Sequence, residues 1–127
     1  MKKRISIVLL ITLFIFLLTS CGEKIPDGIS EEAYEYGLKV VETTEDFLSA
    51  DITVREARDK LDVLSDSMSA LDSEEFEEQI LSTNVSTLHT QFVLAALHDS
   101  SQGSVPSEDI KEIQNSLNSI KEDLGVE

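Results

Sequence analysis

Apolar residues recur at steps of three and four along most of this chain, and this spacing limits the possible folds more than any other feature. The clearest row follows Thr53 and consists of Val54, Ala57, Leu61, Leu64, Met68 and Leu71. Such a row gives a helix one apolar face, which other helices must cover. The sequence has no alternation of apolar and polar residues that would indicate strands. It therefore predicts an all-α protein.

Two helices are expected in the first half of the part that folds in water. The first begins at Ser30, a favourable N-cap residue, and ends near Ser49. Its apolar row consists of Ala33, Tyr36, Gly37, Val40, Val41, Phe47 and Leu48. The second begins at Thr53, which has the spacing of a capping box with Glu56. Because the turn at residues 50–52 is brief, we expect the two helices to form an antiparallel hairpin.

Two more helices are expected in the second half. Asp72 and Ser73 are candidates to cap the third helix, which should stop near Asp99. Its apolar row consists of Phe76, Ile80, Leu81, Val85, Leu88, Phe92 and Ala95. The fourth helix should start after Ser107 as N-cap and end at Gly125. Its row consists of Ile110, Ile113, Leu117, Ile120 and Leu124. Four such rows with short loops predict a small antiparallel bundle of about four helices.

The first twenty residues have a different character from the rest. Three basic residues, Lys2, Lys3 and Arg4, precede an apolar stretch over residues 5–18, and small residues follow at positions 19 and 20. This is the layout of a cleaved secretory signal peptide. The apolar stretch is short for a membrane-spanning helix, which needs about 20 residues.

The junction Leu18-Thr19-Ser20-Cys21 resembles the lipobox of bacterial lipoproteins, which has an aliphatic residue, two small residues and an invariant cysteine. The resemblance implies cleavage before Cys21 and attachment of a diacylglyceryl group, with acyl chains such as palmitate, to its thiol. In many members of this family the new α-amino group of the cysteine is also acylated. The resemblance covers the first 22 residues and implies a lipid anchor at the extracytoplasmic face of the cell membrane. The chain also resembles small surface lipoproteins of Gram-positive bacteria.

These features divide the chain into three parts. Residues 1–20 are expected to be the lipoprotein signal peptide, and residues 21–29 a lipidated tether that contains Pro26 and Gly28. Residues 30–127 are expected to form the helical bundle domain. Because the tether is short, the domain should stay close to the bilayer.

The domain after the signal peptide is strongly acidic. All 25 acidic residues but only seven of the ten basic residues lie beyond Cys21, which leaves a net charge of −18. Such a surface repels nucleic acid and anionic lipid headgroups, so neither is expected as a direct partner. It would attract a basic protein or peptide or divalent cations. The alternative explanation is that the charge only keeps a small helical protein soluble.

No pattern of reactive residues indicates catalysis. The chain has one cysteine, and His89 and His98 are nine residues apart, on opposite faces of a helix. The acidic run at residues 74–78 lacks the spaced pattern of a calcium-binding loop. The sequence therefore predicts a non-enzymatic protein without a cofactor or a metal site.

Residues 79–98 carry no formal charge, which is unusual in so acidic a domain. One interpretation, which we favour, is a central helix that contacts two or three neighbours and exposes little surface. The other is a partly exposed partner surface, where charge is depleted. Its polar part would consist of Thr83, Thr87, Thr90 and Gln91.

Together these features predict a membrane-anchored helical interaction module that binds an envelope protein or peptide. The alternative is a lipoprotein that binds a small ligand or a divalent cation, in a pocket between helices or on the acidic surface. The sequence leaves the oligomeric state open.

Overall fold

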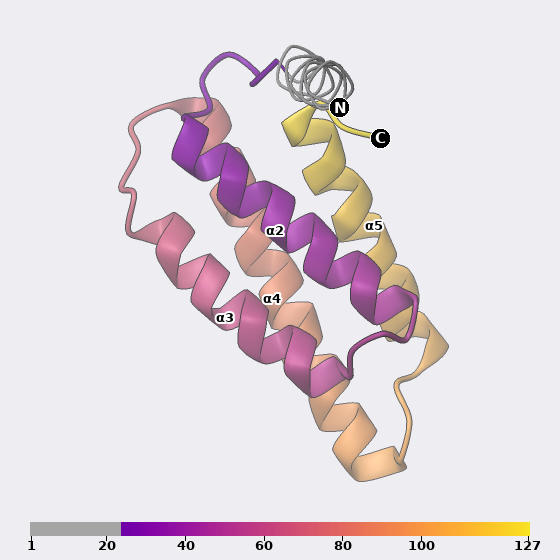
Figure 1. The fold of residues 1–127 in the computed structure, drawn as a ribbon. Helices are drawn as coiled ribbons and strands as arrows, with labels where there is room; N and C mark the ends of the chain where they lie inside the picture. The colour runs from indigo at the N-terminus through magenta and orange to yellow at the C-terminus, as the bar shows by residue number, and fades with distance from the viewer. Residues whose placement is uncertain (1–23) are drawn as a thin grey trace, which may run out of the picture.

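The computed structural model describes residues 24–127, which form a bundle of four helices (Figure 1). The helices are α2 (Glu31–Leu48), α3 (Val54–Ser69), α4 (Phe76–Gln102) and α5 (Ser107–Leu124). Helices α2 and α4 run in one direction, and α3 and α5 run in the other. The described part of the chain contains no strand. The prediction of an all-α, antiparallel bundle is confirmed.

Three of the predicted helix ends are formed by the expected residues. The Ser30 hydroxyl accepts a hydrogen bond from the backbone N–H of Ala33 at 3.2 Å, which caps α2. At the start of α3, Thr53 and Glu56 each accept a hydrogen bond from the other's backbone N–H, at 3.2 and 3.3 Å. Gly125 ends α5 in the left-handed conformation, with φ of 67°.

The predicted start of α4 is wrong by two to three residues. The Ser73 hydroxyl accepts the backbone N–H of Glu75 at 3.1 Å, so it serves the loop and not the helix. Asp72 has a φ of 47°, and such a left-handed residue cannot belong to a right-handed helix. The helix therefore begins at Phe76.

Two other predicted boundaries need smaller corrections. Helix α4 continues past Asp99 to Gln102, and the left-handed Gly103 then ends it. Ser107 is the first helical residue of α5, because Pro106 occupies the N-cap position. The fixed φ of proline suits this entry to a helix.

The core lies between all four helices and includes residues from each apolar row. Its largest fully buried side chains are Phe92, Leu61, Leu81, Leu88, Ile113, Ile120 and Leu124. The Phe92 and Phe47 rings meet edge to face, with centroids 5.0 Å apart. Gly37 lets α2 approach α5 closely, since a Cβ there would lie 2.7 Å from Leu124 Cδ2.

The predicted row of α4 placed two residues wrongly. Phe76 is 69% exposed and Ile80 is 37% exposed, although both were assigned to the buried face of α4. Two rows with helical spacing run along this helix, and the predicted row combined residues from both. In α2, Tyr34 is 5% exposed, and Tyr36, which the predicted row included, is partly buried and packs against the core.

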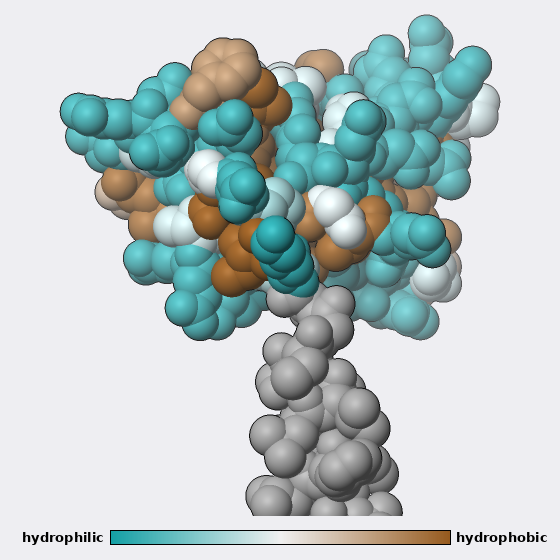
Figure 2. Space-filling model, turned by 90° about the horizontal axis from the view of Figure 1, so that it is seen from above, coloured by the Kyte–Doolittle hydropathy of each residue, from teal (hydrophilic) through white to brown (hydrophobic). Residues whose placement is uncertain are grey.

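The chain before α2 packs onto one end of the bundle. Ile29 is 8% exposed, and Ile25 and Val126 pack against the core. Figure 2 views this end, where hydrophobic side chains gather near the middle and hydrophilic ones surround them. Within residues 24–127, the residues of the core and those packed against it therefore lie between Ile25 and Val126 in the sequence. None of the helices described for residues 24–127 is long and apolar enough to cross a bilayer.

Candidate functional site

Helix α4 is the central helix of the bundle, because it packs against α3 and α5 and, over a smaller area, against α2. Its buried positions are Glu78, Leu81, Val85, Leu88, Phe92, Ala95 and Ala96. This packing agrees with the favoured explanation for the uncharged stretch at residues 79–98. It explains only part of that stretch, however, because the opposite face of α4 remains exposed.

The exposed face carries a second row with helical spacing, which we name the outer α4 row. It consists of Phe76, Ile80, Thr83, Thr87, Thr90, Leu94, Leu97 and Ser101. Consecutive members are four or three residues apart throughout, and all eight are exposed. Leu94 is 47% exposed and Leu97 is 59% exposed. Helix α4 therefore has an apolar row facing the core and an uncharged row of apolar and hydroxyl-bearing residues facing solvent.

The three threonines of the row hold their hydroxyl groups against their own helix. Thr83 donates to the Gln79 carbonyl at 2.9 Å, Thr87 to the Thr83 carbonyl at 3.0 Å, and Thr90 to the Ser86 carbonyl at 3.1 Å. Each hydroxyl donor is therefore already satisfied, and the methyl group is the part of the side chain left to make contacts. A partner helix can cover these residues without leaving an unpaired hydroxyl donor.

Polar contacts to α3 border the outer α4 row on one side. Asp62 Oδ1 lies 3.3 Å from His89 Nε2, and the Ser65 and Ser86 hydroxyls are 3.4 Å apart. Near the C-terminal end of α4, the Arg55 guanidinium donates to the Ser100 hydroxyl at 2.8 Å.

Contacts to α5 border the row on the other side. Asn84 donates its amide to Asp123 at 2.6 Å, and His98 Nδ1 lies 2.6 Å from Asp109 Oδ2. Gln91 lies midway between Asn84 and His98 in sequence, on the same side of α4. Its Oε1 atom is buried and has no hydrogen-bond partner. Of the four predicted partner-surface residues, the three threonines thus lie on the outer α4 row, and Gln91 lies at its edge.

The other chemically active residues do not converge. His89 faces α3 and His98 faces α5, so they lie on opposite flanks of α4 as their spacing predicted. Within residues 24–127 there is no group of three or more His, Cys, Asp or Glu side chains suited to a metal ion. Cys21, the predicted lipidation site, lies outside the described residues.

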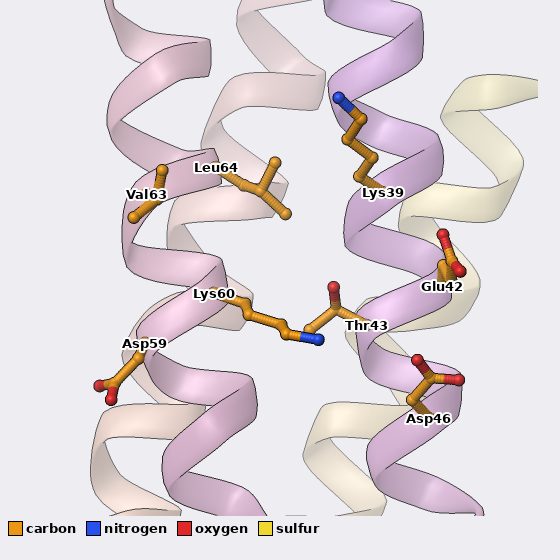
Figure 3. Close-up of a pocket in the computed structure, with 8 residues that line it drawn as sticks. All are labelled: Lys39, Glu42, Thr43, Asp46, Asp59, Lys60, Val63 and Leu64. Atoms are coloured by element: carbon orange, nitrogen blue, oxygen red, sulfur yellow. The ribbon is translucent and has the colours of Figure 1, made fainter. Parts of the chain in front are cut away.

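A groove of about 520 Å³ runs between α2 and α3 (Figure 3). Val63 and Leu64 of α3 form its apolar part, and Lys60 extends from α3 toward Thr43 of α2. Its other lining residues are Lys39, Glu42, Asp46 and Asp59. The groove therefore combines an apolar surface with charges of both signs.

Tyr36 is on α2, and its ring centroid lies 5.9 Å from the Nζ atom of Lys39, which lines the groove. Its hydroxyl donates to Glu32 at 3.3 Å. Partial burial and the nearby Glu32 carboxylate raise the Tyr36 pKa above its ordinary value.

Glu78 is a buried acidic residue that the sequence did not single out. It is 5% exposed, and its Oε2 accepts the backbone N–H of Ser30 at 2.9 Å. This bond joins the first turn of α4 to the start of α2. The sequence could not distinguish Glu78 from the neighbouring glutamates, because all of them belong to one acidic run.

The chain was compared with models of known protein families, with curated proteins and with solved structures, and none of the three comparisons found a match.

Proposed function

We propose that this chain is a lipoprotein anchored through Cys21 to the extracytoplasmic face of the cell membrane. The tripartite signal sequence and the junction Leu18-Thr19-Ser20-Cys21 support this. Ile25, which packs against the core, lies four residues after Cys21. A stretch of four residues spans at most about 14 Å. A lipid on Cys21 would therefore hold the bundle close to the bilayer, with the start of α2 nearest to it.

The test of the anchor is the variant Cys21→Ser in the native host. It removes the thiol that would carry the lipid, so we expect the precursor to remain uncleaved and to incorporate no labelled fatty acid. Ser20→Ala is the matched control, because it keeps a small residue before the cysteine and should be processed normally. Cleavage and fatty-acid labelling of Cys21→Ser at the wild-type level would disprove the proposal.

We propose further that the anchored domain is a non-enzymatic interaction module for an envelope protein or peptide. The outer α4 row carries this proposal, because it is a long uncharged helix face, with exposed apolar residues toward both ends, on a domain of net charge −18. Charge depletion with exposed aromatic and aliphatic side chains is typical of the centre of protein interfaces. A helix that lays its own apolar face along the row is the form of partner that this spacing favours.

Site-specific photocrosslinking in native cells tests the interaction. A photoreactive residue at Leu94 should capture an envelope protein or peptide, and the same probe at Glu35, an exposed position of α2, should not. Thr90→Glu adds a charge one turn away from Leu94 and should remove the captured product. Equal capture at both positions, or capture that survives Thr90→Glu, would count against the module.

The groove between α2 and α3 supports a second candidate, a small-ligand-binding or cation-binding lipoprotein. Thermal melts with Ca²⁺, Mg²⁺ and basic peptides separate the two functions, because a ligand that binds the native state raises the apparent stability. A shift with one ligand class that Lys60→Ala alters and Thr90→Glu does not would favour the groove. The opposite dependence would favour the outer α4 row.

A further inference from the structure

The outer α4 row is a helix face that no other part of residues 24–127 covers, and its composition restricts what can cover it. The row extends about 38 Å from Phe76 to Ser101 at the helical rise per residue. Over residues 79–98 neither the row nor its neighbours on α4 carry a formal charge. A suitable occupant must therefore offer an apolar, uncharged helix face of similar length.

We propose that the occupant is a second copy of this chain, with the two α4 helices parallel and in register about a two-fold axis. In such an interface each residue of the row meets its own counterpart. A charge in the row would then face the same charge on the other copy, so the row must be uncharged where the copies meet. The twenty consecutive residues 79–98 carry no formal charge. Apolar residues meet at both ends of the seam, with Phe76 and Ile80 at one end and Leu94 and Leu97 at the other.

The threonines suit the middle of such a seam. Thr83, Thr87 and Thr90 are short, so the two helices can approach closely where they meet. Their hydroxyl hydrogen bonds lie within each helix, so burial leaves no hydroxyl donor unpaired. Steps of four and three over eight residues match the spacing by which parallel helices pack along a seam.

The flanks of α4 offer complementary charge at one end of the pair. Arg55 of α3 lies beside Ser100, and Asp109 of α5 lies beside His98 on the other flank. A two-fold axis parallel to α4 brings the α3 flank of one copy against the α5 flank of the other. Arg55 of each copy then faces the α5 flank of its counterpart, where Asp109 lies, and this favours the pairing.

The parallel orientation rests on the proposed lipid anchor. Helix α4 begins at the end of the bundle where the chain enters α2, as the bond between Glu78 and Ser30 shows. Two copies anchored in one bilayer through Cys21 therefore present the same end of α4 to the membrane. Anchoring also raises the effective concentration of one copy near another, which strengthens a weak pairing.

Cysteine crosslinking tests the pairing and its direction. A domain that begins at Gly22 has no cysteine of its own, so each variant introduces one thiol. Ile80→Cys, Thr87→Cys and Leu94→Cys should each form disulfide-linked dimers on mild oxidation. Val63→Cys is the matched control, because Val63 is 64% exposed on α3 and lies off the row. In an antiparallel pair the two thiols introduced by Ile80→Cys would be about 25 Å apart, too far for a disulfide.

A charge in the seam supplies the second measurement. Thr87→Glu in the Leu94→Cys background sets two carboxylates against each other and should lower the crosslinked fraction by about tenfold or more. Circular dichroism of this variant should show the same helix content as the wild type, which separates loss of pairing from loss of fold. Crosslinking of the row variants no greater than that of Val63→Cys would overturn the proposal, and crosslinking at position 87 alone would overturn the parallel orientation.

The same variants in the full chain, in native membranes, separate this proposal from the proposed function. If they crosslink while Cys21→Ser is processed like the wild type, the dimer stands and the anchor fails. If the Leu94 photoprobe captures an envelope protein while no row cysteine crosslinks, the interaction module stands and the dimer fails.

Discussion

The two faces of α4 have the same apolar period but different surroundings. On the inner face Leu81, Val85 and Leu88 are fully buried beneath the other three helices. On the outer face Leu94 and Leu97 are about half exposed. Helical spacing thus identifies a face that is able to pack, whereas the number of neighbouring helices decides whether that face is covered within one chain.

The largest expected contrast between the faces concerns their two phenylalanines. Phe92→Ala removes a fully buried ring that contacts Phe47, and should lower the free energy of unfolding by about 3–5 kcal/mol. Phe76→Ala removes a ring that is 69% exposed and should change it by less than about 0.5 kcal/mol. Urea unfolding of the dilute domain measures both. A loss of several kcal/mol for Phe76→Ala would mean that the outer face is covered.

Acidic residues at the start of α4 provide the next contrast. Glu78→Ala leaves the Ser30 N–H without its carboxylate partner and should cost about 1–3 kcal/mol of unfolding free energy. Glu77→Ala changes an exposed neighbour and should have little effect. Equal unfolding midpoints for the two variants would show that the bond between Glu78 and Ser30 contributes nothing to stability.

Much of the fold could be predicted from the sequence because its local signals agree. The capping box at Thr53, the cap at Ser30 and the row containing Leu61 all indicate the same helices. The start of α4 could not be predicted in this way. Ser73 suits either a helix cap or a loop, and only the backbone path of Asp72 decides between them.

The candidate surface could be predicted only in part. The missing charge over residues 79–98 pointed to Thr83, Thr87 and Thr90, and all three are exposed. The apolar members of the row were missed, because an apolar residue at helical spacing is assigned to the core by default. To predict that Phe76 and Ile80 are exposed, one must know which face of α4 the other helices cover.

Gln91 lies at the boundary between the faces and offers a smaller test. Its Oε1 atom is buried without a hydrogen-bond partner, so Gln91→Met, which keeps the size of the side chain, should raise the free energy of unfolding by about 1 kcal/mol. Gln114→Met on the exposed side of α5 is the control and should be neutral. Destabilisation by Gln91→Met would mean that the amide makes a favourable contact in solution.

The smallest expected effect comes from exchanging threonine and valine on the two faces. Thr87→Val removes a hydroxyl that bonds only to its own helix, so the unfolding free energy should change by less than about 0.5 kcal/mol. Val85→Thr, two residues away, adds a hydroxyl to a fully buried position and should cost roughly 1–2 kcal/mol. Urea unfolding at a concentration where the domain is monomeric measures both variants. Equal costs would mean that the two faces of α4 do not differ in their contact with water, and the exposed row would then lose its place as the candidate interaction surface.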